Sequence, residues 1–274
     1  MEAEEDTRET SSFLSAKANV QSTPLIENID NDPKAKKIFY AVIGCLELVG
    51  ILCFILILCW TKHYFGGYAW DGTGKEFNLH PVFMVTGMVL LYGNAAIAYR
   101  VFRNQNKLKI KILHGLIQLG VFIFAVIGLI AVFDFHNAMK IPNMYSLHSW
   151  IGIGTVGLFA CQLLFGFVGF LYPKFSDDYR QIYLKTHVYF GIVIFALAIA
   201  ACVTGLTEKM LFSSSYASQW KELKGAGLVA NILTISLIVF GMLVSFVVYN
   251  PSYKRAADHA DLNYKRTVEY VGLN

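Results

Sequence analysis

The stretch ILHGLIQLGVFIFAVIGLIAVF, residues 112–133, contains no Asp, Glu, Lys or Arg, and it decides the fold. About 20 predominantly apolar residues span the roughly 30 Å hydrocarbon core of a bilayer as a helix. The stretch does not alternate apolar and polar residues as a half-buried strand does, and backbone groups inside lipid must be satisfied within the segment. We therefore predict a transmembrane helix here.

Similar apolar stretches recur along the rest of the chain. Hydrophobic residues make up 55% of the sequence and charged residues 15%, which is unusual for a soluble domain of 274 residues. We predict an all-α, polytopic membrane protein with six transmembrane helices, at Ile38–Trp60, Pro81–Phe102, Ile112–Phe133, His148–Tyr172, His187–Leu206 and Ala226–Tyr249.

The distribution of basic residues predicts the orientation in the membrane. Most of the 23 Lys and Arg residues fall in the two tails and in the second and fourth loops, so both termini should face the cytosol. We expect a disordered cytosolic tail at 1–37, a six-helix domain at 38–250 and a second cytosolic tail at 251–274. The net charge of +4 then reflects membrane topology and gives no support to nucleic-acid binding.

Four histidines carry the chemistry of the sequence. His80, His114, His148 and His187 each stand near the start of an apolar stretch. Two crossings separate His80 from His148, and two separate His114 from His187, so each pair should lie at one depth. Ionisable side chains inside a membrane usually point into the helix bundle and have a function or a partner. Two imidazoles from facing helices are the ligands of a b-type haem, so the pattern predicts a four-helix core with two haem b groups, one near each face.

Two other interpretations of these histidines remain open. They could be unrelated intramembrane histidines, each hydrogen-bonded to a neighbouring helix. They could also belong to a zinc or other metal site, but such a site needs three or four ligands at one depth, and neither pair has an obvious Cys, Asp or Glu beside it.

Several segments resemble the cytochrome b561 family, the ascorbate-dependent transmembrane ferrireductases and monodehydroascorbate reductases. The resemblance runs from about residue 39 to 255 and rests on the histidine spacing and on EFNLHPVFMVTG, YRVFRN, LHG, AVFDFHN, YSLHSW, THVYFGIVIF and GLTEK. It implies a homodimer in which His80 and His148 hold the non-cytosolic haem and His114 and His187 hold the cytosolic one.

The resemblance also implies an electron donor site on the cytosolic side. Positions matching Arg100, Lys107, Lys111 and Arg180 serve ascorbate or the neighbouring haem propionates in the family. Lys107, Lys111 and His114 are spaced to share one helix face, and a cationic rim would concentrate the ascorbate anion. For Arg103, Lys109 and Lys185 we favour ordinary positive-inside charge.

An acceptor site is expected on the opposite face. His136 matches a family position that can bind ferric iron, although a lone loop histidine is often merely solvated. Further family positions that line or adjoin this haem match Asn143, Met144, Tyr145, Ser146 and Glu208.

We therefore expect electron transfer from cytosolic ascorbate to monodehydroascorbate or ferric chelate across a vesicle, lysosomal or plasma membrane. Two alternatives stay open, namely a quinol-linked di-haem subunit of a larger complex and a haem-free metal or proton transporter. Glu47, in the middle of the first predicted helix, has no assigned role.

Overall fold

A computed structural model describes residues 29–212 and 214–255. The chain divides into two compact units, one formed by residues 1–40 with 249–274 and the other by residues 41–248. All candidate site residues lie in the second unit. Among the described residues no strand is present, and six helical spans are long and apolar enough to cross a membrane. The prediction of an all-α polytopic membrane protein is confirmed.

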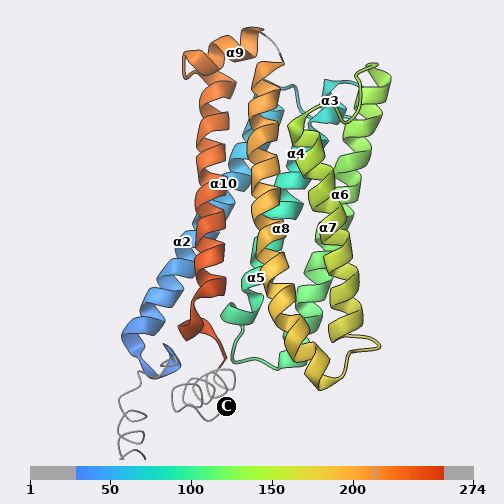
Figure 1. The fold of residues 1–274 in the computed structure, drawn as a ribbon. Helices are drawn as coiled ribbons and strands as arrows, with labels where there is room; N and C mark the ends of the chain where they lie inside the picture. The colour runs from blue at the N-terminus through green and yellow to red at the C-terminus, as the bar shows by residue number, and fades with distance from the viewer. Residues whose placement is uncertain (1–28, 213, 256–274) are drawn as a thin grey trace, which may run out of the picture. The chain divides into compact units, whose positions relative to one another are not determined.

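The six spans contain most of the helices (Figure 1). The first consists of α2 (Pro33–Cys59) and the short π-helix η2 (Trp60–Tyr64), and the second of α3 (Gly74–Phe77), α4 (Leu79–Met84), the π-helix η3 (Val85–Leu91) and α5 (Tyr92–Val101). The other four are α6 (Lys107–Ala138), α7 (Leu147–Phe170), α8 (Asp177–Leu211) and α10 (Gly225–Tyr249). The helix α9 (Ser214–Lys221) connects α8 to α10.

The second to fifth spans pack against one another, with α4 and α5 on α6, α6 on α7, and α7 on α8. The part of α2 within residues 41–248 contacts α10, where a methyl group at Gly50 would lie 3.1 Å from the ring of Phe240. The indole nitrogen of Trp60 donates to the carbonyl of Ala226, 3.1 Å away.

Side-chain caps fix where the site-bearing helices begin. Asn106 accepts the backbone N–H groups of Leu108 and Lys109 and so starts α6. Ser146 accepts the N–H of Ser149 and starts α7. Since such caps satisfy the free N–H groups of a first turn, they set the register of the histidines that follow.

Five of the six spans are longer than the apolar stretches that predicted them, and α7 is one residue shorter. His114 lies seven residues into α6 and His187 ten residues into α8, whereas His148 is the second residue of α7. The expected disordered tail at 1–37 is wrong in part, because η1 (Ile29–Asn31) and the start of α2 at Pro33 are helical. Asp32 accepts the N–H of Lys34 there and caps the helix before its apolar part begins. Residues 1–28 and 256–274 lie outside the described part of the chain.

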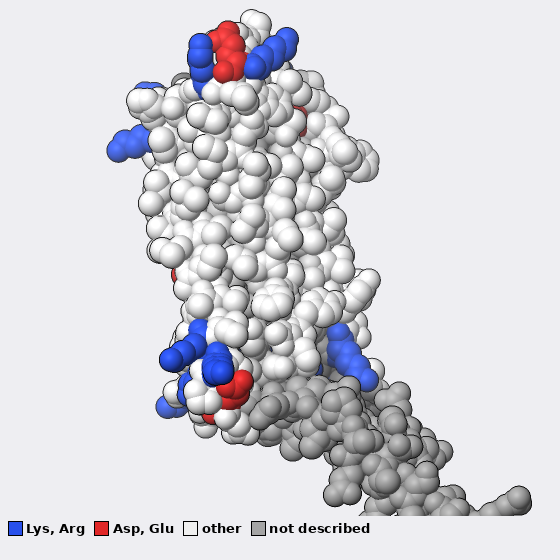
Figure 2. Space-filling view, turned by 90° about the vertical axis from the view of Figure 1, so that its left-hand side faces the viewer, with Lys and Arg blue, Asp and Glu red and all other residues white. Residues whose placement is uncertain are grey.

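Charged side chains gather toward the two ends of the helices on the face drawn in Figure 2. The band between these ends is almost entirely white in that view, as expected for a surface that faces hydrocarbon. On this face, charge is therefore concentrated at the levels where a membrane would meet water.

Candidate functional site: two facing pairs of histidines

The first histidine pair joins α4 to α7. The ring centroids of His80 and His148 lie 6.0 Å apart, and their planes are nearly perpendicular at 83°. With a metal–nitrogen bond of about 2 Å and about 1.1 Å from that nitrogen to the ring centroid, two imidazoles on opposite sides of one metal ion place their centroids about 6 Å apart. The spacing fits two axial ligands of one iron.

The second pair joins α6 to α8. The ring centroids of His114 and His187 are 6.3 Å apart with an interplanar angle of 68°. The structure therefore brings together the same two pairs that the depth argument predicted.

The other ring nitrogen of three of these histidines is held by a backbone carbonyl of a neighbouring helix. Nδ1 lies 3.0 Å from the carbonyl oxygen of Gly128 in His80, 2.8 Å from that of Ala95 in His114, and 2.8 Å from that of Ala201 in His148. A protonated Nδ1 that donates to a carbonyl leaves the lone pair of Nε2 for a metal, which is the usual arrangement of a ligating histidine.

His187 is held differently. Its Nδ1 is buried and has no hydrogen-bond partner among the described residues, while its backbone carbonyl accepts a hydrogen bond of 2.6 Å from Gln162 Nε2. This part of α8 is thus fixed through its backbone rather than through the imidazole.

Two glycines make room for the rings. A methyl group at Gly205 would lie 2.7 Å from Cε1 of His148, and one at Gly166 would lie 3.1 Å from Cε1 of His187. Any larger residue at Gly205 would collide with the ring that it faces.

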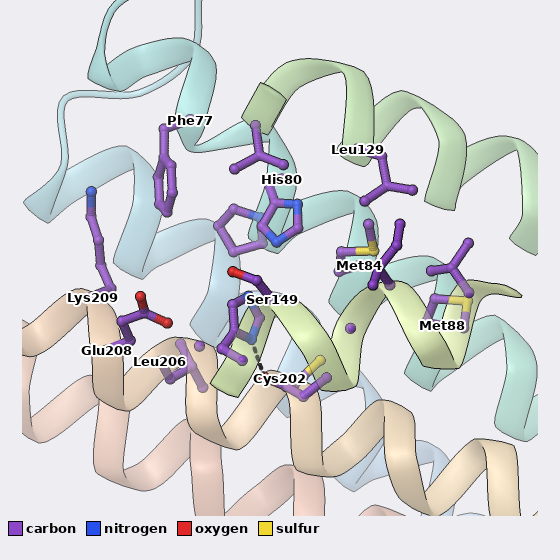
Figure 3. A pocket seen from close by; sticks show the side chains of 18 of the residues that line it. Phe77, His80, Met84, Met88, Leu129, Ser149, Cys202, Leu206, Glu208 and Lys209 are labelled. Atoms are coloured by element: carbon purple, nitrogen blue, oxygen red, sulfur yellow. Dashed lines mark hydrogen bonds between the residues drawn. The ribbon is translucent and has the colours of Figure 1, made fainter. Parts of the chain in front are cut away.

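A cavity surrounds the His80–His148 pair (Figure 3). Its walls are mainly apolar, as is typical of cofactor sites. Met84, Met88, Leu129 and Cys202 lie on one side of the labelled histidine in the close-up, and Phe77, Glu208 and Lys209 lie toward the other.

The loop before α7 closes this cavity with predicted residues. Asn143 and Met144 of this loop line it, together with His136, which lies in the last turn of α6 and not in a loop as expected. Asn143 Nδ2 donates to Asn137 Oδ1 at 2.9 Å. The rings of His136 and Tyr145 stack with centroids 6.5 Å apart. The predicted acceptor-side residues are therefore brought to one mouth of the cavity.

Glu208 ties this loop to α8. Ser146 Oγ donates to Glu208 Oε2 at 2.9 Å, and the Tyr145 hydroxyl also donates to this carboxylate. Partial burial, and then the adjacent Glu208 carboxylate, raise the pKa of the Tyr145 phenol above its usual value. The phenol therefore stays protonated at neutral pH, and its hydrogen bond persists.

Lys209, which the sequence analysis did not single out, also lines the cavity. Its Nζ lies 3.9 Å from the ring centroid of Phe77, 5.2 Å from that of Phe65 and 5.4 Å from that of Phe212. Two signals were present in the sequence: Lys209 ends the GLTEK segment, and it follows Gly205 by four residues, which places both on one face of α8.

Cations gather beside the other histidine pair. Lys111 Nζ donates to the carbonyl of Phe170 at 3.1 Å and is close enough to Arg180, Lys174 and Lys107 to be repelled by them. Arg180 donates to the carbonyl of Phe175 at 3.2 Å and pairs with Asp177. Three predicted donor-site residues, Lys107, Lys111 and Arg180, are thus neighbours.

Arg100, the fourth predicted donor-site residue, contacts a different helix. Its guanidinium donates to the carbonyl of Val248 in α10 at 2.6 Å. At least one role of Arg100 is therefore to join α5 to α10.

Aromatic side chains separate the two pairs. Tyr92 stacks on Phe195 with centroids 5.3 Å apart and contacts Phe159, and all three are buried. Ala201 follows His187 by fourteen positions along α8, which corresponds to about 21 Å of helical rise. The two histidine pairs are thus two sites, and among the described residues no group of three or more His, Cys, Asp or Glu could hold a metal ion.

Comparison with known proteins agrees with this geometry. The family described as eukaryotic cytochrome b561 matches residues 79–213. The lysosomal membrane ascorbate-dependent ferrireductase of Danio rerio is 40% identical over 240 residues, which cover 85% of this chain and 97% of that protein. This chain belongs to the cytochrome b561 family.

Other members show the same degree of similarity. The human lysosomal membrane ascorbate-dependent ferrireductase is 40% identical over 220 residues, which cover 79% of this chain and 91% of the relative. The plasma membrane ascorbate-dependent reductase of Xenopus tropicalis is 41% identical over 210 residues, which cover 76% of this chain and 74% of that relative. Membership in the cytochrome b561 family implies haem b as the cofactor, and the paired imidazoles and apolar cavity walls fit that group.

Proposed function

We propose that this cytochrome b561 is an oxidoreductase that takes single electrons from ascorbate on the cytosolic side and delivers them to ferric iron on the other side of the membrane. The observation that carries the proposal is the presence of two facing histidine pairs, with centroids 6.0 and 6.3 Å apart, near opposite ends of one helix bundle. The names of the ferrireductase relatives support ferric iron as the acceptor.

Each histidine pair would hold one haem b. Nε2 of His80 and His148 would ligate one iron, because Nδ1 of both rings is held by a carbonyl. Nε2 of His114, whose Nδ1 is held in the same way, would ligate the other iron together with the imidazole of His187. Haem b, when bound, supplies a one-electron couple between ferric and ferrous iron. Since imidazoles would fill both axial positions, the sites suit electron transfer rather than oxygen activation.

Lys107, Lys111 and Arg180 would form the ascorbate site. Their charges attract the ascorbate monoanion and hold it beside the His114–His187 pair. The positive-inside rule, applied to the same loops, makes this the cytosolic end.

His136 would bind the ferric acceptor at the mouth of the other cavity. Imidazole is a good iron ligand, and the neighbouring loop residues Asn143, Met144 and Tyr145 form the wall on which a small chelate could rest. Glu208 and Ser146 hold this loop against α8.

The test is a haem count followed by a vectorial assay. Purified protein should contain two haem b per chain, and vesicles loaded with ascorbate should reduce an external ferric chelate. One haem or none per chain would overturn the two-haem assignment. Two haems that ascorbate does not reduce would instead favour a quinol donor.

A further inference from the structure

The structure leaves one cation of the His80–His148 cavity without an anion. Lys209 is half-buried, and among the described residues no carboxylate lies within ion-pair distance of its Nζ. The adjacent Glu208 side chain points away from Lys209 (Figure 3). Its carboxylate accepts hydrogen bonds from Ser146 and Tyr145.

The aromatic rings around Lys209 position its ammonium group but do not neutralise it. Ring faces within about 6 Å attract a cation but carry no net charge. A charge in an apolar cavity is usually paired with an opposite charge. The site therefore calls for an anionic group that these residues do not provide.

The segment before α4 holds the rings in place. Asn78 Nδ2 donates to the carbonyl oxygens of Phe65 and Gly67, at 2.9 and 2.7 Å, and Glu76 accepts the N–H of Gly72. These buried contacts fix Phe65 and Phe77, the two rings nearest to Lys209. Glu76, Phe77 and Asn78, the first three residues of the EFNLHP motif, thus form a fixed binding site for one ammonium group.

This ammonium site lies between the histidine pair and the C-terminal end of α8. Gly205 contacts His148, and Lys209 follows one helical turn later on the same face of α8, about 6 Å closer to the end of the helix. The charged groups on a haem are its two propionate carboxylates. Because anions avoid hydrocarbon, these carboxylates should point toward that end.

We propose that Lys209 binds a propionate carboxylate of the haem held by His80 and His148, and that it thereby sets that haem's reduction potential. This inference rests on the proposed two-haem function. A carboxylate of an external chelate such as citrate offers the same chemistry, so the experiment must separate the two sources.

The experiment is a spectroelectrochemical titration without ascorbate or ferric chelate, on protein already shown to contain two haems per chain. Lys209→Met should shift one haem's reduction equilibrium roughly tenfold toward the ferric form, which is about 59 mV for a one-electron couple. Lys209→Arg should retain the wild-type midpoint because it keeps the charge. Lys75→Met, at an exposed lysine of α3, is the matched control and should change neither midpoint.

The same titration in a His187→Ala background, which keeps the His80–His148 pair, should show the shift in the remaining haem. Loss of that haem from Lys209→Met but not from Lys209→Arg would also support the pairing. Unshifted midpoints, a shift in the other haem, or equal haem loss from both variants would overturn it. If both midpoints are unshifted and Lys209→Met changes only the KM for ferric citrate in a separate steady-state assay, Lys209 acts on the acceptor instead. If the wild-type protein contains fewer than two haems per chain, the proposed two-haem function is refuted, and this result is obtained before the titration.

Discussion

Gly205 of α8 lies directly against the imidazole of His148, so closely that a methyl group at this position would come within 2.7 Å of Cε1 and 2.9 Å of Nδ1. The same imidazole nitrogen contacts the carbonyl oxygen of Ala201, one turn earlier on α8, at 2.8 Å. One face of α8 thus holds the imidazole of His148 through the Ala201 carbonyl and leaves space for it at Gly205.

This relationship predicts that Gly205→Ala displaces the imidazole of His148. A displaced ring cannot keep both its carbonyl partner and its position opposite His80, so haem content should fall from two toward one per chain. Pyridine haemochrome assay with protein quantification measures this. Gly154→Ala on α7 is the control, because nothing lies within 4 Å of a methyl group there. Full haem content in Gly205→Ala would show that the neighbouring helices can shift to accommodate the methyl group.

His136 should affect the acceptor step alone. His136→Ala should slow reduction of external ferric chelate at least roughly tenfold, because losing even a side chain that supports a metal ligand costs about 10- to 100-fold. Both haem spectra and reduction by ascorbate should remain unchanged. His63→Ala, at an exposed histidine of η2, is the matched control. Equal rates for wild type and His136→Ala would place the iron site elsewhere.

The histidine pairs could be predicted from sequence because depth in a membrane follows from counting crossings. His80 and His148 share one depth for that reason, while the orientation of their rings toward each other depends on contacts with Gly128, Ala201 and Gly205. The helix ends could not be found in this way, since α6 and α8 continue past the apolar stretches into polar residues capped by Asn106 or begun by Asp177. The apolar sequence stops at the edge of the hydrocarbon layer, whereas the hydrogen bonding of a helix continues into the polar residues beyond it.

Lys209 illustrates what sequence patterns miss. Its aromatic neighbours Phe65 and Phe77 come from a distant segment, and their positions depend on the buried hydrogen bonds of Asn78. The sequence places Lys209 at the end of the GLTEK segment but gives no role to its side chain. The tertiary contact with Phe77, at 3.9 Å, distinguishes it.

The hydrogen bond between Tyr145 and Glu208 should contribute stability that depends on pH. The pKa of Tyr145 is raised in the folded state, so this contribution is present in full below the ordinary phenol pKa of about 10. It is lost as the pH rises through the higher folded-state pKa. Tyr145→Phe should lower the melting temperature by about 1–2 °C at pH 7, a small effect because the side chain is 54% exposed.

Thermal unfolding in detergent, followed by tryptophan fluorescence at pH 7 and at high pH, measures this difference. The gap between wild type and Tyr145→Phe should close at high pH. Tyr179→Phe, at an exposed tyrosine near the other end of the helices, should melt like wild type at both values. A gap that persists after the phenol has ionised would mean that packing, not the hydrogen bond to Glu208, accounts for the effect.

Lys111 should matter for ascorbate through its charge. Its Nζ is held by the carbonyl of Phe170 and lies among Arg180, Lys174 and Lys107, so the repulsion within this cluster is relieved when an anion binds. Lys111→Gln should raise the KM for ascorbate about two- to fivefold, because a partly exposed charge pair is worth up to about 1 kcal/mol. The effect should shrink at high ionic strength.

Stopped-flow reduction of the haems by ascorbate at several salt concentrations tests this, with Lys109→Gln as the control. Lys109 is an exposed cation in the same turn of α6, and it is not among the charges that act on Lys111. If general attraction to a basic surface were sufficient, both variants would raise KM equally. A specific site requires that Lys111→Gln do so and Lys109→Gln do not.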